Sequence, residues 1–380
     1  MPKGIMNRVK TYGLLLYWGS LLSALHAQTL EHVSADTLAL SSPQKEKELN
    51  FVQKFVRAFS EQDTTYITPN RYNWAFMLQN TNSFESYKLN SRANRQQLNF
   101  YSKPTVKVGP YFGWRWIFLG YTFDVNSLGN GGKSRKTEFE LSLYSAMLGC
   151  DLIYRHTGSD FMLHKVKGFG PAGDMLESTE FDGISVKTKG INVYYIFNHK
   201  RFSYPAAFAQ SSVQRKSCGT WSVGLSYTHH ELDFDTESLP DAVISNPDYP
   251  FSENFMFRQL KYSDFSVNCG YAYNWVFKRN MLLCVAVTPS IGYTKTHSLP
   301  LSDAEAGDNI ASSSPLRLEN INIDVTSRIG LVWNNTKYFA GLSLIAHNFN
   351  YWRNRLALHN TFGTLNFYIG FNFHKRKQYR

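Results

Sequence analysis

The stretch TLNFYIGFNF, residues 364–373, alternates apolar side chains with small or polar ones. A period of two places the apolar side chains on one face of an extended strand. These apolar residues are Leu365, Phe367, Ile369, Phe371 and Phe373. The pattern therefore predicts a β-strand whose apolar face must be shielded from water. A soluble protein would cover it with a second sheet, whereas a membrane barrel would turn it toward lipid and pair the strand edge with the first strand.

The same period of two recurs through the second half of the chain. Further examples are GTWSVGLSYTHH, DFSVNCGYAYNWVF, MLLCVAVTPSIGYTKT and NINIDVTSRIGLVW, which begin at Gly219, Asp264, Met281 and Asn320. These strands run to about 9 to 15 residues, longer than the usual globular strand and long enough to cross a bilayer at a tilt. Aromatic residues gather near the strand ends, as at membrane interfaces, and tight connections alternate with long polar ones.

The second face of these strands carries mainly Ser, Thr, Asn, Gly and Ala, where a sandwich would expose long Lys and Glu side chains. Small polar side chains suit a narrow, crowded lumen. We therefore expect an all-β, antiparallel transmembrane β-barrel of about 12 strands. A soluble periplasmic β-sandwich is the alternative. The polar candidates for the lumen are Asp124, Glu138, Glu140, Asp151, Asp264, Asn268, Asp324, Arg328 and His230.

Composition excludes a helical membrane protein. The chain has 380 residues, of which 43% are hydrophobic, 16% aromatic and 18% charged. Beyond the N-terminus, no apolar run approaches the roughly 18 to 20 residues that a transmembrane helix needs. Alternation dilutes the apolar signal of a β-barrel, so that architecture remains open.

The N-terminus has the features of a secretory signal. Basic residues precede the short apolar core GLLLYWGSLLSALHA, and Ala27 is the expected last residue, although Leu25 departs from the small residue usual at that position. A buried N-terminal helix is the alternative. The expected segments are a signal peptide (1–27), a periplasmic segment with a short amphipathic helix (28–65), the barrel (66–375) and a basic tail (376–380).

Export also narrows the partners. Loss of three basic residues with the signal lowers the formal net charge from +11 to +8, so the mature chain stays basic. For an exported protein we expect outer-membrane lipids and lipopolysaccharide as partners, together with the barrel-assembly machinery and no nucleic acid. The four cysteines have no zinc spacing. Cys269 and Cys284 point to opposite sides of the wall, so we expect free thiols, with a Cys150–Cys269 bond or a Cys218 bridge as alternatives.

Several longer stretches resemble a family of Gram-negative outer-membrane barrels that is catalogued as a domain of unknown function. They are DTTYITPNRYNWAFMLQ, VKVGPYFGWRWIFLGYTFDV, LSLYSAMLGCDLIYRHTGSDFML and YYIFNHKRFSYPAAFAQSSVQRKSCGTW, beginning at Asp63, Val106, Leu141 and Tyr194. Cys218 stands where the family pattern would have a small residue such as Ala. The resemblance implies a barrel in the outer membrane and no particular activity.

Sequence motifs for catalysis are weak. His229 and His230 point to opposite faces of a strand, and there is no HExxH, so we expect no metal and no cofactor. The Gly-rich GNGGK at 129–133 lies between strands and reads as a loop. Ser203 or Ser212 with a histidine could make a lipid hydrolase, but no nucleophile elbow supports it. We expect a protein that is not an enzyme, with an outer-membrane lipid-processing enzyme as the alternative.

The segment NHKRFSYPAAFAQSSVQRKS, residues 198–217, brings together five basic candidates. They are His199, Lys200, Arg201, Arg215 and Lys216. It could fold inward and narrow the lumen, or form a basic mouth for anionic ligands. We favour a solvated connection whose charges face phosphate head groups. The sequence thus predicts an outer-membrane barrel that is a narrow channel for small solutes, or a ligand-binding or structural envelope protein.

Overall fold

The computed structural model describes residues 62–114, 117–125, 136–158, 160–300, 320–353 and 356–379. The predicted signal peptide and nearly all of the predicted segment 28–65 lie outside these residues. The strands are β1 (Ile67–Pro69), β2 (Tyr72–Ser91), β3 (Gln96–Ser102), β4 (Thr105–Trp114), β5 (Ile117–Gly120), β6 (Phe123–Asp124), β7 (Lys136–Tyr144), β8 (Leu148–Gly158), β9 (Phe161–Lys167), β10 (Thr179–Phe181), β11 (Ile184–Ile196), β12 (Ser212–Gln214), β13 (Cys218–Phe234), β14 (Phe257–Lys278), β15 (Met281–Pro300), β16 (Ile321–Asn334), β17 (Tyr338–Arg353) and β18 (Leu356–Lys375). The helices are α3 (Pro171–Met175), α4 (Tyr204–Phe208), α5 (Asp241–Ile244), η2 (Thr236–Ser238), η3 (Glu253–Phe255) and η6 (Lys377–Tyr379).

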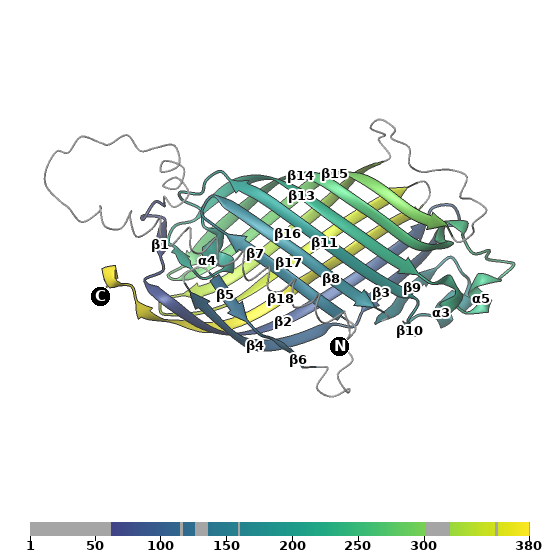
Figure 1. Cartoon of the computed structure of the whole chain (residues 1–380), viewed down its shortest axis with the longest axis horizontal. Helices are drawn as coiled ribbons and strands as arrows, with labels where there is room; N and C mark the ends of the chain where they lie inside the picture. The colour runs from purple at the N-terminus through teal and green to yellow at the C-terminus, as the bar shows by residue number, and fades with distance from the viewer. Residues whose placement is uncertain are drawn as a thin grey trace, which may run out of the picture. The chain divides into compact units, whose positions relative to one another are not determined.

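One large antiparallel sheet forms the wall of the barrel (Figure 1). Its strands follow the order β3-β2-β18-β17-β16-β15-β14-β13-β11-β8-β7, with β4 also on β2. The last strand, β18, pairs with the first long strand, β2, from Leu356↔Ser91 to Lys375↔Tyr72. The edge of the C-terminal strand is therefore paired with the beginning of the sheet, as a barrel requires.

Side chains join β7, at one edge of the sheet, to β3 and β4 near the other edge, where β9 and β10 extend the sheet beyond β3. Lys107 of β4 lies 2.8 Å from Glu138 of β7, and Ser83 of β2 donates a 2.9 Å hydrogen bond to the same carboxylate. Lys136 at the start of β7 donates to the Ser102 hydroxyl at 3.1 Å. We call this contact between β7 and β3–β4 the seam. It brings the ends of the sheet together around one interior.

The outer face of the wall is apolar, as predicted. Along β18, Ile369 is 64% exposed, whereas its neighbour Tyr368 is 8% exposed. The same alternation exposes large apolar side chains on the other long strands, among them Leu225, Phe265, Val267, Trp275, Ile291 and Ile323. An exposed apolar belt on a closed antiparallel sheet is what a bilayer requires of a spanning β-structure. The predicted fold class is confirmed, and the strands are longer than expected, reaching 22 residues in β14.

The two ends of the barrel differ. Strand β2 begins and β18 ends at one end, together with tight connections such as Lys278–Met281 and Asn334–Tyr338. We call this the turn end, and the opposite end, which carries residues 235–256, the loop end. In outer-membrane barrels the short turns face the periplasm. No helix in the described part of the chain is long and apolar enough to cross a membrane.

The interior consists of three layers. A cluster of buried apolar side chains occupies the loop end, and a second cluster occupies the turn end. Between them lies a layer of buried polar and charged side chains, which we call the polar belt. The interior is therefore polar in its middle and apolar at both ends. Near both ends the inward side chains of the wall strands are themselves apolar, as are Phe234 at the loop end and Leu282 at the turn end, and connecting segments that fold into the barrel add further apolar side chains.

The cysteines confirm the predicted facing. All four are free; Cys269 is exposed on the lipid face and Cys284 is buried inside. Neighbouring strands send these two side chains to opposite sides of the wall, so they do not meet.

Candidate functional site

The segment Asn198–Gln214, which we call the plug, leaves β11 at the turn end, enters the barrel and returns to β13. Its short helix α4 begins at Ser203, whose hydroxyl accepts a 3.2 Å hydrogen bond from the Ala206 amide, and Pro205 lies in the first turn, where its missing N–H costs nothing. The α4 residues Tyr204 to Ala207 are buried. Figure 1 shows α4 at the turn end of the strands.

Aromatic side chains of the plug pack on the inner wall. The ring of Tyr204 stacks on Tyr144 of β7 at 5.7 Å between centroids, and Phe208 lies 5.9 Å from the same ring. On the opposite wall, Gly330 of β16 leaves room for the plug. A Cβ atom there would lie 3.1 Å from Phe208 and 3.3 Å from the Ala207 carbonyl. The plug therefore fills the cross-section from one wall to the other.

Buried amide side chains fix the plug in place. Gln214 accepts from the Ser203 amide at 3.0 Å and from Asn274 of β14 at 3.1 Å, and it donates to the Arg201 carbonyl at 2.7 Å. Gln210 donates to the Tyr368 hydroxyl of β18 at 2.7 Å. Because these groups are buried, each unmade bond would leave a desolvated polar atom, so the network specifies one position for the plug.

The plug is also paired with the chain that precedes the barrel. Strand β1 forms a small antiparallel sheet with β12 at the end of the plug, from Ile67↔Gln214 to Pro69↔Ser212. Ile67 is fully buried. The segment leading into the barrel and the plug are thus one hydrogen-bonded unit.

At the loop end, two inserted stretches fill the interior of the barrel. The stretch from β9 to β10, which includes α3, contributes Phe169 and Phe181, and the connection between β13 and β14 contributes Val243, Phe251 and Phe255. All are buried among apolar side chains of the wall. We call these side chains together the loop-end cap. The loop-end cap therefore places an apolar layer across that end of the interior.

The polar belt holds two buried arginine clusters. Arg328 of β16 lies 2.5 Å from Asp151 of β8, and both are 2% exposed. Arg155 of β8 lies 2.6 Å from Glu138 and 3.8 Å from Glu85. The Arg328–Asp151 pair crosses the interior from β16 to β8, whereas Arg155 joins its neighbouring strand β7, through Glu138, to Glu85 of β2 at the seam. A charge in such a place needs its partner, since removal of one leaves the other desolvated.

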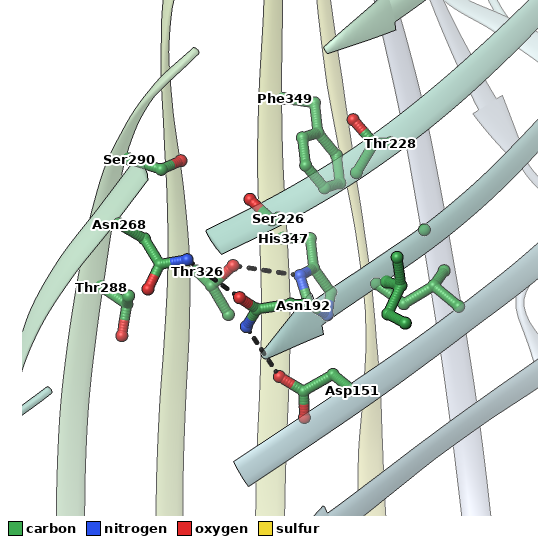
Figure 2. A pocket seen from close by; sticks show the side chains of 13 residues that line it. Asp151, Asn192, Ser226, Thr228, Asn268, Thr288, Ser290, Thr326, His347 and Phe349 are labelled. Atoms are coloured by element: carbon green, nitrogen blue, oxygen red, sulfur yellow. Dashed lines mark hydrogen bonds between the residues drawn. The ribbon is translucent and has the colours of Figure 1, made fainter. Parts of the chain in front are cut away.

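Amide and hydroxyl groups continue the belt around a small cavity (Figure 2). Asn192 donates to Asp151 at 3.0 Å and accepts from Asn268 at 2.9 Å, while Thr326 and the Nδ1 of His347 lie 3.2 Å apart. The cavity volume is about 30 Å³. That is room for water and too little for a solute such as a sugar.

The predicted lumen residues differ in burial: Asp124, Glu138 and Glu140 are half-buried, and the other six are buried. Asp264, Thr294 and Asn322 form a buried hydrogen-bonded group, and Asp324 accepts from the Asn350 amide at 2.8 Å. His230 is buried and stacks on Tyr262 at 4.7 Å. Glu140 lies 3.4 Å from His347, and Asp124 lies opposite Lys107 in the register of β6 and β4. They do not converge on one reacting centre, and no group of metal-binding side chains occurs among the described residues.

The basic segment, residues 198–217, does not form the solvated connection that we favoured from the sequence. A solvated connection is the wrong interpretation for residues 202–207, 210 and 212–214, which are buried in the barrel. His199 is also buried, and its Nδ1 lies 3.2 Å from the Ile196 carbonyl oxygen. The cations at the two ends of the plug, Lys200, Arg201, Arg215 and Lys216, are exposed at the turn end. Burial of the neutral middle and exposure of the charged flanks follow from the cost of desolvating charge.

One cluster that the sequence did not predict lies on the outer face near the loop end. His229 of β13 lies 2.8 Å from the Ser263 hydroxyl through Nδ1 and 3.3 Å from Glu231 through Nε2. The three side chains meet because His229 pairs with Ser263 in register and Glu231 is the next outward residue. Only the cross-strand register, which the sequence does not state, brings the serine to the histidine.

The chain was compared with protein families and with solved structures. The profile of a family described as a domain of unknown function (DUF4421) matches residues 61–373. Among solved structures, the chain is similar to the P. putida toluene transporter TodX, at 11% identity over 80% of this chain and 91% of that chain, with a TM-score of 0.22. It is similar to the beta domain of the Bordetella autotransporter BrkA at 10% identity, over 76% and 98% of the two chains, with a TM-score of 0.27.

A third similar structure is the outer membrane protein OprG from Pseudomonas aeruginosa, at 9% identity over 80% of this chain and 98% of that chain, with a TM-score of 0.22. The comparison with curated proteins gives no match. Likeness at this level carries no argument about activity. The function has to be inferred from the geometry of the chain.

Proposed function

Because the chain belongs to the DUF4421 family and is an outer-membrane β-barrel, we propose that it is a closed envelope protein with a structural and binding role. In this proposal it is neither a diffusion pore nor an enzyme. The observation that carries the proposal is the packing of both ends of the interior, by the plug and by the loop-end cap. A passive solute pathway would have to cross both apolar layers.

The polar belt supports the same proposal. Its charges are paired at short distances, as in Arg328–Asp151 at 2.5 Å and Arg155–Glu138 at 2.6 Å, and its cavity has a volume of about 30 Å³. Paired charges hold facing walls together, whereas a conducting lumen needs polar groups left open to solutes. In this proposal the belt is an internal brace for the wall.

Conductance tests the proposal. The purified protein in planar bilayers is expected to give no steady single-channel steps, and liposomes containing it are expected not to swell in arabinose. A general porin reconstituted in parallel supplies the positive control. Steady conductance that disappears when the plug is cross-linked to the wall would overturn the proposal in favour of a narrow channel.

The Ser263–His229–Glu231 contacts favour a second candidate, hydrolysis of lipid esters at the outer rim. A serine, a histidine base and a carboxylate in hydrogen-bonding order are the elements of nucleophilic acyl transfer. Two features weigh against it. The histidine presents Nδ1 to the serine, opposite to the usual arrangement, and the backbone between β13 and β14 is paired in register around the cluster, which leaves no evident oxyanion donors.

Reaction with a fluorophosphonate probe separates the two candidates. The closed-barrel proposal predicts that wild type and Ser263→Ala are equally unlabelled and equally inert toward a fluorescent phospholipid. Labelling and lipid turnover that are both lost in Ser263→Ala would establish the hydrolase instead.

A further inference from the structure

The turn end of the barrel carries a concentration of positive charge. Its exposed cations are Arg71, Lys200, Arg201, Arg215, Lys216, Lys278, Arg279, Lys337, Lys375 and Lys377. Among the described residues of the turn end, the only carboxylate is Asp63, which lies 3.6 Å from Arg201 and accepts hydrogen bonds from Thr65. Asp63 compensates only a small part of this positive charge, so the surface attracts anions.

Arg215 is the ordered centre of this surface. Its Nε donates to the Thr68 hydroxyl of β1 at 2.9 Å, and its Nη1 donates to the Asn280 side chain in the β14–β15 turn at 2.9 Å. Both acceptors are neutral, so the guanidinium is held in position while its charge stays uncompensated. The two N–H groups on Nη2 are left for another acceptor, because a guanidinium has five donors in a fixed fork.

Two more arginines act on the same group. Partial burial lowers the pKa of Arg215, and the positive charges of Arg71 and Arg279 lower it further. Arg71 lies between β1 and β2, and Arg279 is the neighbour of Asn280 in the turn. Arg215 is bonded to Thr68, three residues before Arg71, and to Asn280, the residue after Arg279. Three separate segments, namely the start of the barrel, the residue that follows the plug and a wall turn, therefore bring arginines close to one another.

We propose that Arg71, Arg215 and Arg279 form a binding site for a phosphate group at the periplasmic rim of the barrel. Guanidinium forks match the oxygen spacing of phosphate, and a multiply bonded oxyanion can take donors from several arginines at once. The inference is independent of the closed-barrel proposal, because it depends only on the rim.

The place of the site in the bilayer fits two sources of phosphate. Arg279 follows the exposed side chains Trp275 and Phe277, which are 52% and 41% exposed at the end of β14. Aromatic residues mark the level of the lipid head groups, so a phospholipid of the inner leaflet can reach the site. Free inorganic phosphate in the periplasm offers the same chemistry. In either case the bound group would link the residue that follows the plug to the wall.

Binding and stability measurements on the full chain test the site. In detergent, inorganic phosphate is expected to bind by calorimetry and to raise the unfolding temperature above that in sodium chloride of equal ionic strength. Arg279→Gln is the primary variant, because the described structure gives this side chain no hydrogen bond to lose. It is expected to weaken phosphate binding about tenfold or more. Lys337→Gln removes one exposed cation from another turn at the same end and should bind as wild type does.

A second arm identifies the source. Nanodiscs of phosphatidylcholine, with and without phosphatidylglycerol, are compared for wild type, Arg279→Gln and Lys337→Gln. Stabilisation by phosphatidylglycerol alone that Arg279→Gln abolishes assigns the site to lipid; stabilisation by inorganic phosphate assigns it to the free ion. Equal responses of Arg279→Gln and Lys337→Gln in both arms, or no response of wild type in either, would overturn the proposal. Arg215→Lys serves as a second variant, keeping the charge while removing the fork.

Discussion

At the scale of single residues, the interior depends on a few buried charges whose partners come from distant parts of the chain. Arg328 and Asp151 are 177 positions apart in sequence and 2.5 Å apart in space, and the Arg328 guanidinium lies 5.5 Å from the Tyr194 ring. An arginine in such a place does not gain stability from burial itself, because desolvation opposes the attraction. The pair instead makes the position of β16 depend on that of β8, because each buried charge needs the other.

Replacement of Arg328 by Met should therefore lower the free energy of unfolding by about 3 to 5 kcal/mol, because Asp151 is left buried without its counter-charge. Urea unfolding in phosphatidylcholine vesicles, followed by tryptophan fluorescence, measures the loss. Arg328→Met combined with Asp151→Asn should recover part of it. A single variant as stable as wild type would show that the pair is dispensable.

Gly330 gives a second residue-scale prediction. Gly330→Leu should lower the free energy of unfolding by about 1 to 3 kcal/mol, since a side chain there overpacks against Phe208. Gly330→Ala is the matched control and should lower the free energy of unfolding less, because Phe208 and the Ala207 carbonyl need to move by only a few tenths of an ångström to admit one carbon. The same unfolding assay applies. Equal stability of both variants would contradict the tight packing of the plug against β16.

At the scale of elements, the plug depends on the Gln214 side chain. Gln214→Ala removes the bonds to the Ser203 amide, Asn274 and the Arg201 carbonyl while leaving β12 able to pair with β1. Hydrogen exchange should rise over residues 198–214 and stay unchanged in the wall strands. Ser211→Ala, which alters a half-buried neighbour, is the control. A uniform rise across all strands would instead indicate global destabilisation.

The wall strands could be predicted from sequence, and the plug could not. A strand such as Thr364–Phe373 shows its face in its own alternation, because one side meets lipid and the other meets side chains. The plug has no period: YPAAF is a five-residue apolar run between basic flanks, and the amides of Gln210 and Gln214 look like solvent-facing groups. Only the three-dimensional fold reveals that those amides satisfy buried partners. The loop-end cap did leave a trace, since Val243, Phe251 and Phe255 are large apolar residues in a supposedly polar loop.

The candidate site residues divide in the same way. That Asp151, Asp264 and Arg328 point inward follows from strand parity. Which carboxylate meets which arginine does not, because pairing across the interior depends on how the sheet curves and on the stagger of its strands. The Ser263–His229 contact likewise depends on register.

At the scale of the whole molecule, the apolar belt fixes where the barrel can reside. Ile291 is 63% exposed in the middle of β15. Ile291→Arg should lower the free energy of unfolding from vesicles by about 2 to 4 kcal/mol, the cost of a cation at mid-bilayer depth. Tyr249→Arg, at a 42% exposed position in a loop, is the control and should change little. Equal effects of the two would contradict the assignment of the belt to lipid.

The pairing of β1 with β12 has a mechanical consequence. Tension applied to the chain ahead of residue 62, from the periplasmic side, would reach β12 before it reached the wall. Peeling would start at Asp63, whose amide donates to the Lys200 carbonyl, and would then reach the Tyr66–Arg215 hydrogen bond and the Ile67–Gln214 pair, where the glutamine that fastens the plug is located. A force on the segment ahead of the barrel would therefore act on the plug through the three residue pairs between β1 and β12.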